Sequence, residues 1–164
     1  MEIERKFLIR QMPEHLEQYP CLPLEQAYLC TNPVVRVRRE GEDFYLTYKG
    51  RGKMIREEYN LPLNREAYAH LLPKADGTVI TKKRYRIPLA PYTAEVDVFE
   101  GILKGLVLAE VEFPSEEEAL AFLPPDWMGE EVTQDSRYHN SFLSSLDSRK
   151  DACGILGLPL DGPG

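Results

Sequence analysis

The chain has 164 residues, of which 43% are hydrophobic and 29% are charged. This length suits a single domain with its own core, and no apolar run approaches the ~20 residues that a transmembrane helix needs, so we predict a soluble protein without a membrane partner. The formal net charge of −7 also argues against binding to nucleic acid, which requires a surplus of basic surface.

The chain begins with acidic residues, Glu2 and Glu4, instead of the basic region and apolar stretch that open a secretory signal, so we predict a cytoplasmic protein. The cysteines are three in number and contain no Cys-x-x-Cys pair, which favours neither a disulfide framework nor a thiolate zinc site. The three histidines are scattered along the chain and are not taken as metal ligands.

Short runs rich in Val, Ile, Leu, Tyr and Thr, separated by Gly, Asn, Asp or Pro, predict a mainly β protein with peripheral helices (α+β). Two Gly-containing links, at residues 40–43 and 50–53, are typical of tight hairpins and therefore of antiparallel pairing. We predict eight strands, at Glu2–Ile9, Leu24–Cys30, Val34–Arg39, Phe44–Lys49, Met54–Leu61, Val79–Ile87, Thr93–Phe99 and Val107–Phe113.

Helix signals lie between and after these strands. Asn64 is a predicted N-cap, and Ser115 followed by Glu118 matches a capping box. We predict helices at Pro13–Gln18, Asn64–Leu72, Ser115–Phe122 and Ser136–Ser148. Residues 149–164 form a Gly/Pro-rich tail, a composition typical of a mobile terminus. Its Leu and Ile residues leave open packing on the barrel surface or on a second copy, as in a homodimer.

Alternation within each strand is the decisive pattern, because residues two apart in a strand point to the same face. In the first strand Glu2, Glu4 and Lys6 share one face, and Arg5 points to the other. The same rule groups charged residues on every later strand except the second: Arg36 with Arg38, Thr47 with Lys49, Arg56 with Glu58, Lys82 with Arg84 and Arg86, Glu95 with Asp97, and Glu110 with Glu112.

Any one of these alternations is best explained as a solvated polar face over an apolar core. Together they place acidic blocks on the first and last strands and basic blocks between them. If the strands close into a barrel, this face is the lumen, and so many cations there require a polyanion or counter-charges. A chain of phosphates satisfies the arginines and lysines, while clustered carboxylates bind hard divalent cations.

The opening Glu2-Ile3-Glu4-Arg5-Lys6 resembles the Glu-x-Glu-x-Lys signature of the CYTH family, the triphosphate tunnel metalloenzymes. Further motifs follow in the family's order, and the resemblance covers about residues 1–146 of a tunnel domain that we assign to residues 1–148. These motifs are Gln26-Ala27-Tyr28-Leu29, Arg36-Val37-Arg38, Thr47-Tyr48-Lys49, Arg56-Glu57-Glu58-Tyr59, Lys82-Lys83-Arg84-Tyr85, Glu95-Val96-Asp97-Val98-Phe99, Glu110-Val111-Glu112-Phe113 and Arg137-Tyr138-His139-Asn140.

This resemblance implies an eight-stranded antiparallel β-barrel that forms a tunnel for a triphosphate and a metal ion. It implies Mg²⁺ or Mn²⁺ ligands at Glu2, Glu4, Glu110 and Glu112, with Asp97 as an addition. It implies phosphate contacts from Lys6, Arg36, Arg38, Lys49, Arg56, Lys82 and Arg84. One departure is Asn60, which stands where small relatives often carry a further acidic residue.

In the implied reaction, tripolyphosphate or a related triphosphate loses orthophosphate when water attacks in line, with Glu2 or Glu4 helping to orient that water. The resemblance also pairs Lys82 with Tyr28. A lysine among cations has a lowered pKa and can exchange protons as an acid or a base. The alternative for Tyr28 is a packed barrel tyrosine with a satisfied hydroxyl.

Three other functions stay open. A class IV-type adenylyl cyclase needs an adenine-binding wall and releases pyrophosphate. A thiamine triphosphatase needs an aromatic surface near a tunnel mouth, for which Trp127 is the candidate, although a lone Trp is more often part of a core. A polyphosphate-binding module without turnover would not need four glutamates in a cationic tunnel.

Overall fold

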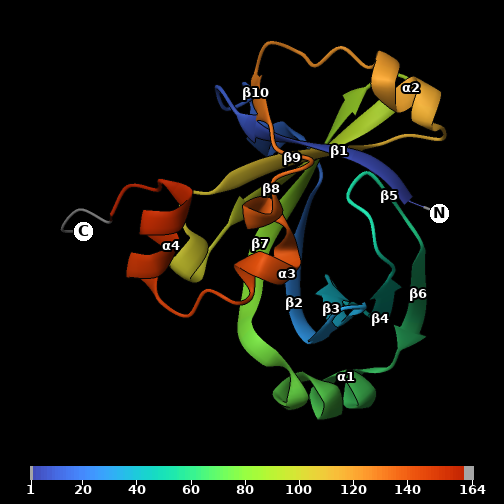
Figure 1. Cartoon of the computed structure of the whole chain (residues 1–164), viewed down its shortest axis with the longest axis vertical. Helices are drawn as coiled ribbons and strands as arrows, with labels where there is room; N and C mark the ends of the chain where they lie inside the picture. The colour runs from blue at the N-terminus through green and yellow to red at the C-terminus, as the bar shows by residue number, and fades with distance from the viewer. Residues whose placement is uncertain (1, 161–164) are drawn as a thin grey trace.

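The computed structural model describes residues 2–160. Within them, ten strands form one antiparallel sheet in the order β10-β1-β9-β8-β7-β2-β3-β4-β6, and β5 pairs with β1 (Figure 1). The strands are β1 (Glu2–Ile9), β2 (Cys21–Thr31), β3 (Val34–Glu40), β4 (Asp43–Lys49), β5 (Ile55–Arg56), β6 (Glu58–Leu63), β7 (Asp76–Leu89), β8 (Tyr92–Phe99), β9 (Val107–Glu112) and β10 (Met128–Glu131).

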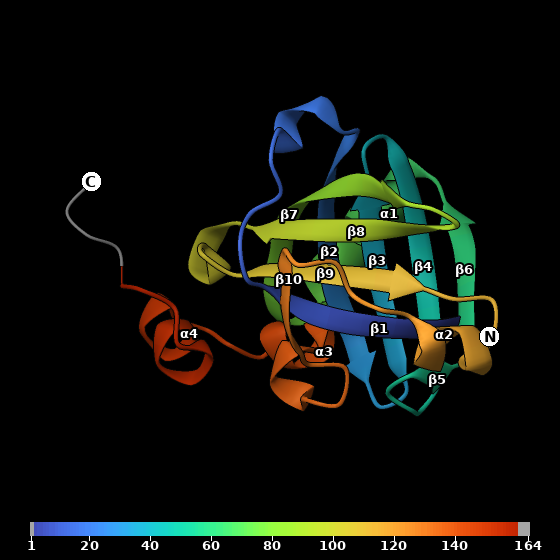
Figure 2. The same ribbon diagram turned by 90° about the horizontal axis from the view of Figure 1, so that it is seen from above.

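The sheet curves into a barrel that β5 closes. β5 directly precedes β6 in the chain and pairs with β1 through Glu2 with Arg56 and Ile3 with Ile55. If β5 and β6 are taken as one position, eight positions surround the lumen, each corresponding to one predicted strand. Figure 2 shows β1, β8 and β9 on the near side of the barrel, with β2, β3 and β4 behind them. The predicted antiparallel barrel is therefore confirmed, and β10 is an additional strand outside the ring that pairs with β1.

The predicted strand Met54–Leu61 is wrong in its continuity. Its first part pairs with β1, whereas its second part pairs with β4, and Glu57 separates the two. The closing segment has to leave one neighbour to reach the other, so it bends between them. Sequence alternation also missed β10, whose four residues are too short to show a period.

Two predicted helices form on the outside of the barrel. They are α1 (Arg65–Leu71), where Asn64 Oδ1 accepts from the Ala67 N–H at 2.7 Å, and α2 (Glu116–Ala121), where Ser115 Oγ accepts from the Glu118 N–H at 3.1 Å. The N-cap residues were thus predicted correctly. Short 3-10 turns complete the first part of the chain: η1 (Leu16–Gln18), η2 (Leu72–Lys74) and η3 (Gly101–Leu103).

The predicted helix Pro13–Gln18 is wrong, because only η1 forms. His15 has φ 55°, a left-handed conformation that a right-handed helix cannot continue through. The predicted helix Ser136–Ser148 is also wrong. It divides into η4 (Ser136–Tyr138) and α3 (Asn140–Leu143), because His139 between them is extended and its ring nitrogen contacts the Thr133 carbonyl.

The Gly/Pro-rich tail contains a helix that composition did not predict, α4 (Arg149–Leu156). Ser148 caps its start by accepting from the Asp151 N–H, and Gly157 ends it in a left-handed conformation. Ala152 and Leu156 are buried in the same apolar cluster as Leu103 of η3. Of the two arrangements that the sequence left open, the structure therefore shows packing against the chain's own barrel end.

Two apolar clusters lie on the outer faces of the sheet. One joins β1, β8 and β9 to α2 through Phe7, Val96, Val111, Phe113 and Ala119. The other joins β2, β3 and β4 to α1 through Ala27, Val37, Phe44 and Tyr68. The helices thus cover the outside and leave the inward faces free for polar side chains. No helix within residues 2–160 has the length and apolar character to span a membrane.

The third cluster fills one end of the barrel. Ile80, Phe99 and Leu108 follow the same alternation as the inward charged residues of β7, β8 and β9, so they point into the barrel at that end. Tyr138 and Leu143 of the C-terminal segment pack against them. The charged lumen is therefore blocked at one end by apolar side chains.

Candidate active site

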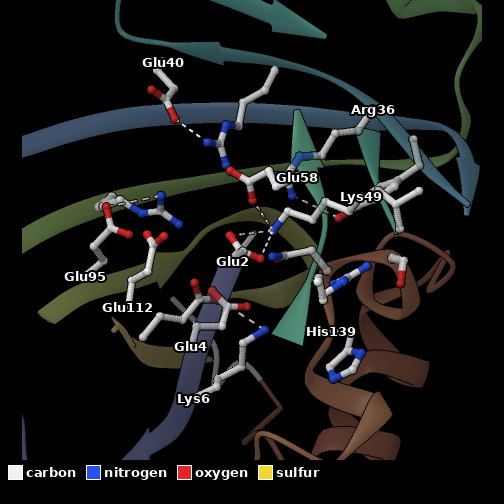
Figure 3. A pocket seen from close by; sticks show the side chains of 18 of the residues that line it. Glu2, Glu4, Lys6, Arg36, Glu40, Lys49, Glu58, Glu95, Glu112 and His139 are labelled. Atoms are coloured by element: carbon white, nitrogen blue, oxygen red, sulfur yellow. Dashed lines mark hydrogen bonds and ion pairs between the residues drawn. The ribbon is translucent and has the colours of Figure 1, made fainter. Parts of the chain in front are cut away.

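The inward charged residues surround one cavity of about 260 Å³ (Figure 3). All but two of the sequence-predicted site residues line it, and the exceptions, Lys82 and Asp97, lie in the wall behind it. The lining residues that the sequence predicted are Glu2, Glu4, Lys6, Tyr28, Arg36, Arg38, Lys49, Arg56, Arg84, Glu110 and Glu112. Arg5 points outward, as alternation requires, and binds Glu131 with Nη2 to Oε1 at 2.6 Å.

The acidic wall is formed by β1 and β9, which pair directly. Glu4 lies opposite Glu112, and Lys6 lies opposite Glu110, whose Oε1 is 3.2 Å from the Lys6 Nζ. Burial and the Glu110 charge raise the pKa of Glu4 to about 7. The pKa of Glu110 itself is lowered, because Lys6 and Arg84 outweigh its burial. Glu4 and Glu110 thus share the same lysine charges, Lys6 and Lys49. A further cation would be attracted to this pair of carboxylates.

Glu2 is in a second crowded group with Lys49 and Glu58. The Lys49 Nζ lies 3.0 Å from Glu2 and 3.2 Å from Glu58. Burial and a hydrogen bond with Glu58 raise the pKa of Glu2 to about 8, whereas the pKa of Glu58 is lowered because this hydrogen bond and Lys49 outweigh its burial. Asn60, the departure from the family pattern, donates to Glu58 Oε1 at 2.8 Å and accepts from Thr47.

The basic wall is formed mainly by β3. Arg36 is buried and its Nη1 lies 3.5 Å from the Tyr28 hydroxyl. Burial and the neighbouring charges of Arg36 and Arg84 lower the pKa of Arg38 to about 10, and Glu40 holds the Arg38 Nη2 at 2.6 Å. Like charges are therefore packed together in a low-dielectric lumen, an arrangement that a bound polyanion would stabilise.

Asp97 lies behind the cavity in a buried ion-pair group. Its two oxygens bind the Arg84 Nε at 2.7 Å and Nη2 at 2.9 Å, and its Oδ2 also lies 2.7 Å from the Lys82 Nζ. Lys82 further contacts Asn140 Oδ1 at 3.3 Å. Among residues 2–160 the hydrogen bonds of Lys82 are to Asp97 and Asn140, not to Tyr28. In this arrangement Asp97 orients two cations, and a metal ion would have to displace them.

The C-terminal segment provides cavity residues that the sequence interpretation did not include. His139, Asn140 and Ser141 line the cavity, and the Lys6 Nζ donates to the Tyr138 carbonyl at 3.0 Å. The motif Arg137-Tyr138-His139-Asn140 is the sequence signal that points to these residues, whereas the spacing of the three histidines does not. The other lining residues outside the predicted set are Val34, Glu40, Glu58, Arg86 and Glu95.

Comparison with known proteins decides the family. The model of the CYTH domain family matches residues 1–141. The protein belongs to the CYTH domain family. A Nitrosomonas europaea inorganic triphosphatase is 41% identical over 147 residues, which cover 87% of this chain and 96% of that protein. An Acetivibrio thermocellus inorganic triphosphatase is 38% identical over 151 residues, which cover 87% and 92% of the two chains.

A solved structure agrees with these relatives. The crystal structure of an inorganic triphosphatase superposes on this CYTH protein with a TM-score of 0.68 and 38% identity, covering 90% of this chain and 97% of that chain. The fold is therefore shared with a triphosphatase over nearly the whole length of the solved protein.

The donor set of this CYTH protein fits a hard divalent cation. Glu2, Glu4, Glu110 and Glu112 supply only carboxylate oxygens, the ligands that Mg²⁺ and Mn²⁺ prefer. Within residues 2–160, no three acidic, His or Cys side chains are already gathered around one point. The carboxylates instead pair with lysines or share protons, so binding a cation would replace those protons and rearrange the pairs.

Proposed function

We propose that the protein is a divalent-cation-dependent triphosphatase that hydrolyses inorganic tripolyphosphate to orthophosphate and pyrophosphate. The observation that carries this proposal is the charged cavity of the barrel, where an acidic wall on β1 and β9 faces a basic wall on β3. The two relatives named inorganic triphosphatase support it, since each matches 87% of this chain. Cytoplasmic location and a homodimer stay predictions from the sequence.

In this proposal the basic side chains hold the phosphates. Arginine guanidinium groups bind phosphate oxygens in pairs, and lysines act as point charges. Arg36 and Arg38 are suited to this role because Arg36 is buried, Arg38 is half-buried and their charges are crowded, so an anion relieves their mutual repulsion. The complete phosphate-binding set is Lys6, Arg36, Arg38, Lys49, Arg56, Lys82 and Arg84, in which Lys82 contributes from behind the cavity.

The acidic side chains hold the cation. Glu2, Glu4, Glu110 and Glu112 would bind Mg²⁺ or Mn²⁺, and Asp97 would contribute by fixing Lys82 and Arg84. When bound, such an ion neutralises phosphate oxygens and lowers the pKa of water. Glu2 and Glu4 then orient the water that attacks the terminal phosphorus in line, as the anhydride P–O bond breaks on the opposite side.

Lys82 is the residue proposed to move a proton. Burial lowers its pKa to about 8 despite the Asp97 charge, so both protonation states are accessible near that pH. As an acid it would protonate the leaving phosphate oxygen. Tyr28, whose hydroxyl contacts Arg36, would help to position the phosphates near Lys82.

The competing activities find less support in the cavity. Its lining is charged or polar apart from Val34 and Tyr28, which leaves little apolar surface for an adenine ring. Trp127, the candidate for holding a thiazolium ring, packs against the outer cluster of β1, β8, β9 and α2. The wall chemistry therefore favours a substrate that consists of phosphates alone.

A product assay tests this proposal. Purified protein is incubated with tripolyphosphate, ATP or thiamine triphosphate, each with Mg²⁺, Mn²⁺ or a chelator. Orthophosphate from tripolyphosphate, dependent on the cation, is the expected result. Cyclic AMP from ATP would instead identify a cyclase, and thiamine diphosphate as the preferred product would identify a thiamine triphosphatase. Tight tripolyphosphate binding without any product would identify a binding module.

A further inference from the structure

Gln26 is the most unusual polar residue of the barrel. It lies in the middle of β2 and is 0% exposed. Neither its Nε2 nor its Oε1 has a hydrogen-bond partner within residues 2–160. Buried side-chain amides are nearly always hydrogen-bonded, because an unpaired buried donor or acceptor is destabilising. Because both polar atoms of the Gln26 amide are unpaired, its presence at this buried position has to be explained by something other than its contribution to stability.

The strand register places Gln26 in the basic wall. Gln26 pairs with Arg38 of β3 and Tyr28 pairs with Arg36, with an unbroken register between them, so these four side chains share the inward face. On its other side Gln26 pairs with Ile80 of β7. The Gln26 side chain therefore lies on the inward face beside the phosphate-binding arginines, in the layer directly behind the residues that line the cavity.

The neighbours of Gln26 explain why its amide N–H group has no acceptor. Arg36, Arg38 and the diagonal neighbour Lys82 carry only donors. The Nε of Arg36 and the Nε of Arg38 are themselves buried without partners among the described residues. Arg38 is held instead by Glu40, 2.6 Å from its Nη2. The Gln26 Oε1 and the Arg38 Nε–H on the adjacent strand are thus an unused acceptor and an unused donor. A bound anion would supply the missing acceptor for the Gln26 amide N–H.

We propose that Gln26 is a substrate-positioning residue: when a triphosphate fills the tunnel, the Gln26 Oε1 accepts from the Arg38 Nε–H and the Gln26 Nε2 donates to a phosphate oxygen. The phosphate draws the Arg38 guanidinium away from Glu40, and Gln26 then fixes the plane of that guanidinium for paired contacts with phosphate. This inference rests on the proposed function, because it takes a triphosphate as the ligand.

The test replaces Gln26 by leucine, which has similar volume and no polar atoms. Without ligand, Gln26→Leu should raise the melting temperature by about 3 °C, since two unpaired polar groups leave the interior. With tripolyphosphate and Mg²⁺, the ligand-induced rise in melting temperature should be smaller than in the wild type. In kinetics, KM for tripolyphosphate should rise about tenfold while kcat stays within about twofold.

Gln18→Leu, the same substitution at an exposed position, is the matched control and should change none of these quantities. If Gln26 instead holds an internal water, Gln26→Leu should lower the melting temperature without ligand and leave KM unchanged, and either result overturns the inference. Wild-type protein that binds tripolyphosphate without cleaving it would refute the proposed function alone. A wild-type melting temperature that tripolyphosphate does not change would refute both.

Discussion

At the scale of single residues, the lumen is a set of competing charges. Glu4 lies opposite Glu112, and burial together with the Glu110 charge raises the pKa of Glu4 to about 7, so this carboxyl is partly protonated near neutral pH. Lys82 lies between Asp97, which attracts a proton, and Arg84, which repels one. These two residues therefore give the sharpest tests of the acidic and basic roles.

Glu4→Gln should lower cation-dependent turnover of tripolyphosphate by more than about a hundredfold, because an amide is a weaker cation ligand than a carboxylate and carries no charge. Steady-state kinetics across a Mg²⁺ and Mn²⁺ titration measure this effect. Glu57→Gln, the same substitution at an exposed position between β5 and β6, is the control and should keep wild-type rates. Full activity in Glu4→Gln would remove Glu4 from the site.

Lys82→Arg should bind tripolyphosphate with a KM within about threefold of the wild type but turn it over at least about tenfold more slowly. The charge is kept, whereas the arginine pKa lies too high for proton exchange. The wild-type rate should change with pH around the Lys82 pKa of about 8, and this dependence should disappear in the variant. A pH–rate profile measures it, and identical profiles would exclude the acid/base role.

At the scale of elements, the helices serve to cover the outer faces of a barrel whose inside is polar. α1 is short and packs on the cluster that includes Phe44 through the buried Tyr68. Since so short a helix is unstable alone, its N-cap and this packing must hold it in place. Asn64, whose Oδ1 accepts the Ala67 N–H at 2.7 Å, provides that cap.

Asn64→Ala should lower the free energy of unfolding by about 1 kcal/mol and the melting temperature by about 3 °C, because the Ala67 N–H loses its acceptor. Asn64→Asp retains an acceptor and should stay within about 0.5 kcal/mol of the wild type. Denaturant unfolding measures both, and tripolyphosphate turnover should be unchanged because α1 lies outside the barrel. Equal stability of Asn64→Ala and the wild type would show that packing alone holds α1.

At the scale of the whole molecule, the buried carboxylates of the tunnel make the free energy of unfolding depend on both pH and divalent cations. The folded-state pKa values of Glu2, about 8, and Glu4, about 7, lie above the ordinary value of 4.5. The folded state therefore holds protons that the unfolded state has lost, and stability falls as pH rises toward 8. Burial lowers the pKa of His139 below its ordinary value of 6.5. This residue therefore makes stability rise with pH, but only below about pH 6.5.

In a chelator, the melting temperature should accordingly fall between pH 6.5 and pH 8, the window set by the His139 reference value and the Glu2 pKa. Adding Mg²⁺ or Mn²⁺ should raise the melting temperature more at pH 8 than at pH 6.5, because the cation replaces protons that are easier to remove at high pH. Thermal melts at both pH values measure this. A cation effect that does not grow with pH would argue against Glu2 and Glu4 as ligands.

The sequence by itself determined which side chains face the lumen. Alternation is local, because neighbouring residues of a strand must point to opposite faces, and it separated Glu4 and Lys6 from Arg5 without any tertiary information. The N-caps Asn64 and Ser115 were equally local signals. Eight strand positions and a charged lumen followed from such patterns, and the barrel confirms them.

Only the tertiary structure decided which inward charges meet. Register and barrel closure bring Asp97 against Arg84 and Lys82. They also leave the Gln26 amide beside Arg38 without a hydrogen-bond partner among the described residues. His139 lines the cavity because its own extended backbone interrupts the helix that the sequence predicted there. Distances between side chains on different strands depend on the packing of the whole ring, and a two-residue period within one strand carries no information about them.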